Sequence, residues 1–506
     1  MAVKRNILAN YFGAGWTALM TLAFIPIYIR YLGVEAYGLI GLFAMLQGWL
    51  LLLDLGMAPA IGREMASFDG SAGRAQALRD LLRSTEAIAL ALAALVAAGL
   101  WLASDWLATR WLSPREVSAG TVMQSLAIMG GVVGLRIVEN LYRSTLIGLQ
   151  RQVLLNAINS AVATFRGLGA VAVIALLSPT LQAFFLWQGV VSLVSVFLLA
   201  CAAYGVLPRG DASGTFSLQA LGGVWRFAAG TMTITVLSLL LTNVDKILLS
   251  HLLALEDFGY YAFAIVVANA PLALVAPIAQ AVYPRFTQLT ASGEQANLAT
   301  TYHSTAQLVV VLLGSATVVL ALLGRELLRR WTGDPALADR AYPLVIVLSL
   351  GSLLNGLMTI PYYLQLSAGW TGLTVRVNLI AILLVIPALL MVVPKQGAMG
   401  AAGIWLLLNA FLMAAVIPRL HRRLLPMEKK RWWLQDVAIP LLSALAMAGT
   451  LHILLRFMPG AAHNILVLAT CAVLVTLATM LAAPLVRERT VSLLGKRRQA
   501  EPLDQS

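Results

Sequence analysis

The chain has 506 residues, of which 60% are hydrophobic and 11% are charged, and its mean hydropathy is +0.85. A water-soluble globule cannot carry so apolar a composition, so we expect a polytopic membrane protein. The net charge of +13 does not indicate a nucleic-acid partner, because most basic residues fall in alternate connections between apolar segments.

Apolar stretches of roughly 20 residues, long enough to cross about 30 Å of hydrocarbon, occur about fourteen times. These runs are continuous and do not alternate over about ten residues, so we expect an all-α fold and no β-barrel. The first run is too long for a signal-peptide core and lacks a convincing cleavage site, so we expect it to be retained. The predicted spans are 7–29, 37–60, 84–107, 119–147, 153–177, 182–206, 222–250, 260–284, 303–324, 341–366, 373–393, 398–417, 435–456 and 463–485.

Basic residues separate into a rich and a poor set of connections. By the positive-inside rule the rich set is cytoplasmic, which places both termini inside and agrees with an even number of spans. A local exception is the basic group Arg325, Arg329 and Arg330, which falls in a predicted outer connection. The rich set comprises Lys4, Arg5, Arg63, Arg74, Arg79, Arg83, Arg151, Arg209, Arg285, Arg419, Arg422, Arg423, Lys429, Lys430, Arg431, Arg487, Arg489, Lys496, Arg497 and Arg498.

Cofactor chemistry has little support in the sequence. Cys201 and Cys471 both lie in predicted spans, which excludes a disulfide framework and a metal cluster. No Walker lysine loop occurs, so we expect no ATP and no other cofactor, and transport energy would come from a gradient or a partner. The histidines lie near predicted helix ends and are interpreted as interfacial: His251, His303, His421, His452 and His463.

An internal repeat divides the chain. The segment 31–41 ("YLGVEAYGLIG") follows the first span and 252–262 ("LLALEDFGYYA") follows the seventh, with Glu35 matching Glu256 and Gly38 matching Gly259; the same offset pairs Arg63 with Arg285. Six helices separate the copies, so both halves have the same orientation, as in transporters with a site between two bundles. The predicted parts are an N-lobe at 1–206, a cytoplasmic linker at 207–221, a C-lobe at 222–420, a basic linker with helices 13 and 14 at 421–486, and a cytoplasmic tail at 487–506.

Trp432 and Trp433 close the basic stretch before span thirteen. Tryptophan is enriched at the level of the lipid headgroups, so we expect both indoles to anchor there.

Charged residues inside the predicted membrane region are the main functional signal. Arg136, Glu139 and Arg143 form one stripe on the fourth helix, and Arg166 lies near the middle of the fifth. An arginine at that depth costs at least about 2.5 to 3.5 kcal/mol if it faces lipid, so these side chains should face a paired or water-filled interior.

Two interpretations of this stripe compete. Arg136 and Glu139 could form a buried ion pair that fixes helix packing, aided by the small residues Gly130 and Gly134. Alternatively, surplus positive charge lines a cavity for an anion. Basic residues outnumber acidic ones among the candidates, which favours the cavity: Arg136, Arg143, Arg166, Arg226, Arg376 and Lys246 stand against Asp54, Glu139 and Asp245.

The remaining charges are less decisive. Asp54 could bridge to a cavity arginine or respond to a coupling ion. Asp245 and Lys246 are adjacent and point about 100° apart, so we expect no simple pair between them. Arg226 and Arg376 lie near the cytoplasmic end of their spans and are expected to snorkel.

Several segments carry a family resemblance: "IPIYIRYLGVEAYGLIGL" (25–42), "DLGMAPAIGREMA" (54–66), "LTNVDKILLSHLLALEDFGYYAFA" (241–264) and "VYPRFTQL" (282–289). In order and spacing the chain resembles the polysaccharide biosynthesis flippases, O-antigen type, of the multidrug/oligosaccharidyl-lipid/polysaccharide exporter (MOP) superfamily. The resemblance implies two six-helix lobes like those of multidrug exporters, plus two C-terminal helices. It also implies alternating-access movement of an undecaprenyl-diphosphate-linked oligosaccharide to the outer leaflet of the bacterial cytoplasmic membrane.

The resemblance extends to lipid II flippases, which also have fourteen spans and whose extra pair borders a groove for the polyprenyl tail. The predicted first span carries no arginine before Arg30, whereas lipid II flippases place basic residues along that helix. This departure argues against lipid II as the substrate.

With this resemblance, Arg136 and Arg166 are the first candidates to hold the diphosphate, because guanidinium groups suit phosphate oxygens and keep their charge. Arg143, Arg63, Arg285 and Lys246 are further candidates for the cavity, and Asp54, Glu139 and Asp245 for coupling or charge pairing. A proton, a sodium ion or the membrane potential is the expected energy source. The expected partners are the lipid-linked oligosaccharide, the bilayer and glycan polymerase or assembly proteins, with the chain itself a monomer. Two rivals stay open: a multidrug exporter, and a membrane glycosyltransferase or polymerase.

Overall fold

The computed structural model describes residues 2–48, 57–66, 72–208, 214–218, 243–370, 372–458 and 464–488, with the side chains at 2–11, 14, 58–60, 63, 72 and 73 left out. Helices dominate this part of the chain, and no strand occurs within it. Contacts divide the chain into two units, Met1–Ala262 and Phe263–Ser506. Asp54, Arg209, Arg226 and most of the predicted linker lie outside the described residues.

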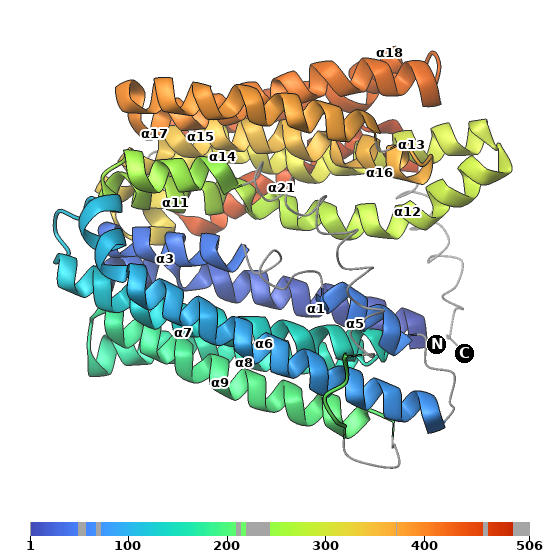
Figure 1. The fold of residues 1–506 in the computed structure, drawn as a ribbon. Coiled ribbons are helices and arrows are strands. Elements are labelled where there is room, and N and C mark those ends of the chain that lie inside the picture. The colour runs from blue at the N-terminus through green and yellow to red at the C-terminus, as the bar shows by residue number, and fades with distance from the viewer. Residues whose placement is uncertain are drawn as a thin grey trace, which may run out of the picture. The chain divides into compact units, whose positions relative to one another are not determined.

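The first unit is a helical bundle around one central helix. Helix α7 contacts α5, α6 and α9, while α8 contacts α1 and α9 (Figure 1). The helices are α1 (Ala2–Ala23), α2 (Ile25–Leu32), α3 (Val34–Gly48), α5 (Met57–Ala66), α6 (Ala72–Trp106), η1 (Leu107–Trp111), α7 (Ala119–Gly148), α8 (Gln152–Ala172), η2 (Val173–Leu177) and α9 (Leu181–Val206), followed by a helical stretch at 243–252 and the start of α11 (Leu255–Asn269).

The central helix packs closely because of its small residues. A Cβ added at Gly134 would lie 2.6 Å from the carbonyl oxygen of Ala93 on α6, so only glycine allows this approach. Ile137, Leu141 and Leu146 of the same helix belong to a buried apolar cluster with residues of α5, α6 and α9. The predicted packing role of Gly134 is therefore confirmed, and α7 is held rigidly where it carries its charges.

The two copies of the predicted repeat contact one another. A Cβ at Gly38 would lie 2.6 Å from the carbonyl oxygen of Leu255, and one at Gly259 would lie 2.3 Å from that of Val34. In each copy of the repeat, the matched glycine therefore approaches a backbone carbonyl group of the other copy. We expect such reciprocal contacts between copies that are related by an axis along the membrane normal. Nearby, the buried Glu35 accepts hydrogen bonds from the backbone N–H groups of Arg115 and Glu116 at 2.6 and 2.7 Å.

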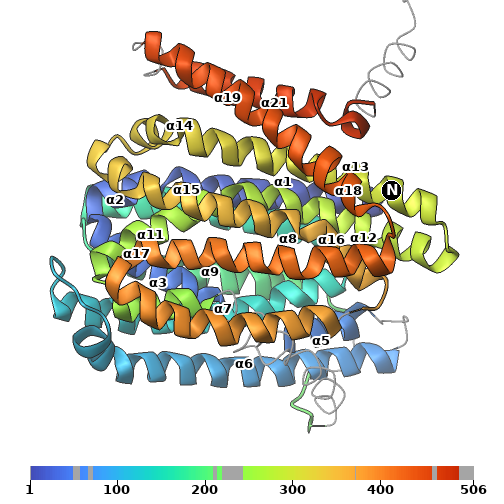
Figure 2. The same cartoon turned by 90° about the horizontal axis from the view of Figure 1, so that it is seen from above.

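The second unit contains the remaining described helices. They are η3 (Ala270–Leu274), α12 (Val275–Ser292), α13 (Gln295–Val309), η4 (Val310–Gly314), α14 (Ser315–Thr332), α15 (Pro335–Leu357), α16 (Thr359–Ser367), α17 (Gly372–Leu424), α18 (Lys429–Arg431), η5 (Trp432–Ala438), α19 (Ile439–Phe457) and α21 (Ile465–Leu481). Figure 2 shows α19 and α21 side by side, and both contact α14.

Helix α17 is two helices joined by a sharp bend. Its bend is at Gly397, whose φ of 59° and ψ of −146° are non-helical, a conformation that glycine adopts without a Cβ clash. The predicted spans 373–393 and 398–417 match its two halves. Their outer ends, near Arg376 and Arg419, return to the same end of this unit.

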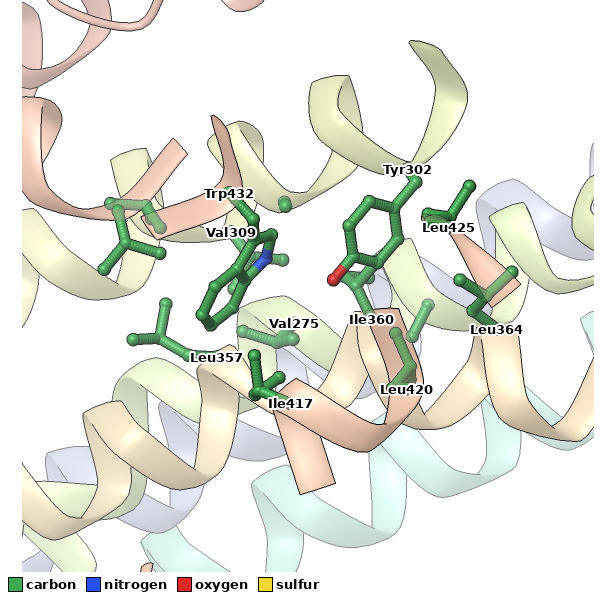
Figure 3. Close-up of a cluster of buried hydrophobic side chains, with 14 of the residues drawn as sticks. Val275, Tyr302, Val309, Leu357, Ile360, Leu364, Ile417, Leu420, Leu425 and Trp432 are labelled. Atoms are coloured by element: carbon green, nitrogen blue, oxygen red, sulfur yellow. The ribbon is translucent and has the colours of Figure 1, made fainter. Parts of the chain in front are cut away.

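The second unit has its own apolar core. Val309, Leu357, Ile417 and other aliphatic side chains surround Trp432 and Tyr302 (Figure 3). Trp432 is completely buried, so its predicted place at the headgroup level is wrong: the indole fills the joint between η5 and the bundle. The basic residues that precede Trp432 in the sequence suggest a place at the membrane–water interface. The position of the indole is set instead by its packing against apolar side chains from distant segments.

Polar groups also pin η5 to α13. His303 is fully buried, contacts Asp436 through Nδ1, and lies 2.9 Å from Glu428 through Nε2. Gln307 donates to Asp436 at 2.9 Å and accepts from the backbone N–H of Leu485 at 2.9 Å. The interfacial interpretation of His303 is therefore wrong, because a buried acid supplies the partner that water would supply at an interface. It is also wrong for the buried His421, whose ring lies 2.9 Å from the carbonyl oxygen of Ile417.

Ten described helical segments are long and apolar enough to cross a membrane. The fold class, an all-α polytopic membrane protein with lobes of the multidrug-exporter type, is confirmed by the structural similarity described below. The number of fourteen spans stays a prediction, since most of the seventh lies outside the described residues. The basic exception near Arg325 has a local explanation: Arg325 and Arg329 both bond Asp339, at 2.8 and 2.9 Å.

Candidate functional site

Glu139 is the centre of a basic cluster in the first unit. Its carboxylate lies 3.6 Å from Arg143 on the same helix and 3.7 Å from Arg166 on α8. Arg136 lies one turn earlier on α7, close enough to interact electrostatically with Glu139 and Arg143. The predicted stripe on α7 is confirmed, and the structure adds Arg166 to it. We call Arg136, Glu139, Arg143 and Arg166 the basic cluster.

The pairing inside this cluster differs from the sequence-based alternative. An ion pair between Arg136 and Glu139 is one candidate from the sequence, but Glu139 pairs instead with Arg143 and Arg166. Among the described residues, Arg136 makes no ion pair within 4.0 Å. Two guanidinium groups therefore share one carboxylate, and with Arg136 beside them the cluster keeps a net positive charge.

Hydrogen bonding in the basic cluster is incomplete. Both carboxylate oxygens of Glu139 are buried without a hydrogen-bond partner in the described part of the chain, and so are Nε of Arg136, Nε of Arg143 and Nη1 of Arg166. Buried polar atoms are nearly always satisfied, so a group of unsatisfied ones needs an explanation. The exposed side-chain fraction falls from 34% at Arg143 through 16% at Arg166 to 2% at Glu139. This gradient leaves an accessible guanidinium edge in front of a buried acid.

Two polar residues of α8, Asn159 and Ser160, are buried on the helix that carries Arg166, and sequence reasoning missed them. Oδ1 of Asn159 and Oγ of Ser160 are buried with no hydrogen-bond partner among the described residues. Asn159 precedes Arg166 by seven positions and therefore lies on the same helix face. That spacing is readable in the sequence, but uncharged polar residues inside a span carry too weak a signal. Asn159 and Arg166 therefore share one face of α8, and the amide of Asn159 offers donors and an acceptor suited to hydroxyl groups.

The other predicted site residues are scattered. Asp54 lies outside the described residues, and Arg63 has only its backbone described, on α5. Arg285 is exposed on α12 of the second unit.

Asp245 and Lys246 form a pair after all. Nζ of Lys246 lies 3.6 Å from Oδ1 of Asp245, and Oδ2 accepts a hydrogen bond from the Tyr261 hydroxyl at 3.0 Å. The prediction that adjacent helical residues cannot pair is wrong here, because the four-carbon stem of lysine bends back across the angle between them. Asp245 is 13% exposed and lies outside the basic cluster.

A second buried acid of the first unit, Glu86 on α6, also escaped the sequence analysis. Its Oε1 accepts hydrogen bonds from the hydroxyl groups of Tyr142 and Tyr204, both at 2.7 Å. Its Oε2 pairs with Arg83 at 3.0 Å. This carboxylate is fully satisfied and joins α6 to α7 and α9, which is a structural arrangement.

No group of His, Cys, Asp or Glu among the described residues could hold a metal ion. The chemistry available at the basic cluster is therefore electrostatic. Arginine presents a planar fork of donors that matches phosphate oxygens two at a time, and Glu139 offers a counter-charge that an anionic ligand would displace.

Long apolar helices carrying a buried basic cluster define a multi-pass membrane protein of the transporter class. Residues 3–290 match the model of the family described as polysaccharide biosynthesis protein, which is more than half of the chain. The protein belongs to this family.

A curated relative agrees with the family. A Shigella flexneri protein named "Putative O-antigen transporter" is 22% identical over 429 residues, covering 83% of this chain and 99% of that protein. Relatives of this chain are transporters, and the chain is a transporter and not an enzyme.

Solved structures agree on the fold. The inward closed conformation of the lipid II flippase MurJ has a TM-score of 0.68 at 14% identity, covering 93% of this chain and 97% of that one. An inward-facing multidrug resistance MATE family transporter of the MOP superfamily has a TM-score of 0.65 at 12% identity, covering 82% and 96%. The chain therefore shares the fold of these two transporters.

Proposed function

We propose that this protein translocates an undecaprenyl-diphosphate-linked oligosaccharide from the cytoplasmic to the outer leaflet of a bacterial cytoplasmic membrane by alternating access. The observation that carries the proposal is the basic cluster, in which Arg143 and Arg166 lie 3.6 and 3.7 Å from one buried carboxylate without hydrogen-bonding it, and Arg136 adds a third guanidinium group one turn away. The family match and the similarity to an O-antigen transporter support a glycan substrate.

The cluster suits the chemistry of a diphosphate. A diphosphate brings several oxygen acceptors, and the unsatisfied nitrogens of Arg136, Arg143 and Arg166 are donors. Glu139 neutralises only one of the three guanidinium charges, and a bound diphosphate would neutralise the remaining positive charge. Each unpaired hydroxyl of the sugars would cost roughly 2 to 7 kcal/mol in hydrocarbon, and Asn159, on the same face of α8 as Arg166, provides a polar partner. The polyprenyl tail stays in lipid.

Energy for export can come from the membrane potential. An anion that leaves an inside-negative cell moves downhill by about 2.3 kcal/mol per charge per 100 mV, so two net charges supply roughly 4 to 5 kcal/mol. Asp54, Glu139 and Asp245 are the carboxylates at which a proton or sodium ion would couple. Glu139 is favoured because it belongs to the basic cluster, so binding of a cation to its carboxylate would change the charge of the anion site directly.

The rival functions have less support. A multidrug exporter for cationic compounds needs an acidic binding region, and the cluster here has surplus positive charge. A glycosyltransferase or polymerase needs catalytic carboxylates in sizeable outer loops. Asp339, in a predicted outer connection, is paired with Arg325 and Arg329.

A transport assay with the purified full chain tests the proposal. Reconstituted in liposomes with a fluorescent undecaprenyl-diphosphate oligosaccharide, the wild-type protein should move the label across the bilayer. Arg136→Ala and Arg166→Ala should lower the rate at least about tenfold each, since each removes one charge-assisted phosphate contact. Arg110→Ala is the matched control, because Arg110 is exposed on η1 and is not part of the basic cluster. Equal rates in all four proteins would refute the assignment.

A further inference from the structure

A second basic site lies in the second unit, between the two halves of α17. A groove of about 820 Å³ is lined on its apolar walls by Val377, Ile380, Phe411 and Ala414, among others. Three arginines, Arg376, Arg419 and Arg423, line it together with Trp370. Since the bend at Gly397 brings the two ends of α17 together, the basic groups gather at one end of this groove and the apolar walls continue from them.

The three guanidinium groups are held open and unneutralised. In the described part of the chain, none of Arg376, Arg419 and Arg423 forms an ion pair, and all three are exposed. Arg423 stacks over the Trp370 ring at 4.5 Å, and Arg419 donates to the carbonyl oxygen of Ala415 at 2.6 Å. These contacts orient two of the cations while leaving further N–H donors for another ligand.

The groove differs from a simple surface patch because it is amphipathic. Ile380 and Phe411 are 48% and 39% exposed, and both lie in segments predicted to span the membrane, so acyl chains are their natural neighbours. The positive-inside rule assigns Arg419 and Arg423 to the cytoplasmic side. Basic pockets between transmembrane helices on that side suit the headgroups of anionic lipids.

We propose that this groove binds an anionic membrane phospholipid of the cytoplasmic leaflet, with its phosphate held by Arg376, Arg419 and Arg423 and its acyl chains along Ile380 and Phe411. The phospholipid stays bound to the transporter as a structural lipid and is not the transported substrate. The basic cluster around Glu139 belongs to the other unit and uses different residues, so this proposal does not depend on the proposed function.

Lipid titration of the full-length protein tests the site. The chain is purified in detergent, stripped of lipid, and titrated with phosphatidylglycerol while bound lipid is counted by native mass spectrometry. One molecule should bind to the wild type, and Arg376→Ala/Arg423→Ala should weaken its binding about tenfold or more. Arg422→Ala is the matched control: Arg422 is exposed next to Arg423 but does not line the groove, so binding should not change.

A filling variant tests the apolar part separately. Ala414→Trp adds bulk to the wall while keeping all three arginines, and it should also weaken binding about tenfold or more, with an unchanged melting temperature in lipid-free detergent. If Arg422→Ala weakened phosphatidylglycerol binding as much as Arg376→Ala/Arg423→Ala, the lipid would be held by general surface charge. If phosphatidylcholine bound as tightly as phosphatidylglycerol, the site would not recognise an anionic headgroup. Displacement by inorganic phosphate alone would identify a free-phosphate site, and tighter binding of undecaprenyl phosphate would assign the groove to the substrate. Each of these results would overturn the proposal.

Discussion

Glu86 and Glu139 are two buried acids of the same unit, and they differ in how their charge is compensated. Glu86 accepts two tyrosine hydroxyls at 2.7 Å and an arginine at 3.0 Å. Glu139 has two arginines at 3.6 and 3.7 Å and no hydrogen-bond partner among the described residues. Short, complete contacts hold helices together, whereas long, incomplete ones leave donors and charge available to a ligand. Burial alone does not separate the two roles; satisfaction of hydrogen bonds does.

The largest expected effect comes from reversing a charge in the basic cluster. Arg166→Glu should lower transport at least about 100-fold, because it removes a phosphate contact and places a second anion beside Glu139. Arg110→Glu, at an exposed position of the same unit, should keep most of the activity. The rate of flipping in liposomes measures both, and a transporting Arg166→Glu protein would contradict the assignment of Arg166.

The second effect is on folding and concerns the other acid. Glu86→Ala should lower the free energy of unfolding by about 2–4 kcal/mol, since it leaves the hydroxyl groups of Tyr142 and Tyr204 without their acceptor. Denaturation of the purified protein, followed by circular dichroism, measures this decrease. Tyr204→Phe should destabilise less, because it removes only one of the two hydroxyl groups that bond Glu86; an unchanged free energy of unfolding in Glu86→Ala would contradict the structural role of Glu86.

The smallest expected effect is on ligand binding, and it tests whether Glu139 acts as an internal counter-charge to the arginines. Glu139→Gln removes the anion that competes with a ligand, so inorganic pyrophosphate should raise the melting temperature of this variant more than that of the wild type. The difference corresponds to about 1 kcal/mol, and it should shrink at high salt. Glu86→Gln is the control, and an equal response in both variants would show that pyrophosphate acts elsewhere.

Much of the fold can be predicted from the sequence because membrane helices are defined by local composition. The fourth span is predicted at 119–147 and α7 runs over Ala119–Gly148; the bend at Gly397 falls between two predicted spans. Trp432 and His303 are misplaced by the sequence because their surroundings come from distant segments: apolar side chains around the indole, and Asp436 beside the imidazole.

The candidate site divides in the same way. The stripe of Arg136, Glu139 and Arg143 follows from helical periodicity, so it is predictable. That Arg166 reaches Glu139, and that Tyr142 and Tyr204 converge on Glu86, depends on how α6, α7, α8 and α9 pack. Periodicity gives the face of a helix but not its partner.

Binding of the intact substrate tests the central claim most directly. Undecaprenyl-diphosphate oligosaccharide should bind the wild-type protein in nanodiscs. It should bind Arg136→Ala/Arg166→Ala at least about 100-fold more weakly, because each substitution removes one charge-assisted hydrogen bond to the diphosphate. The Glu86→Gln protein, measured at a temperature where it is folded, should bind like the wild type. Wild-type affinity in the double arginine variant would contradict the account.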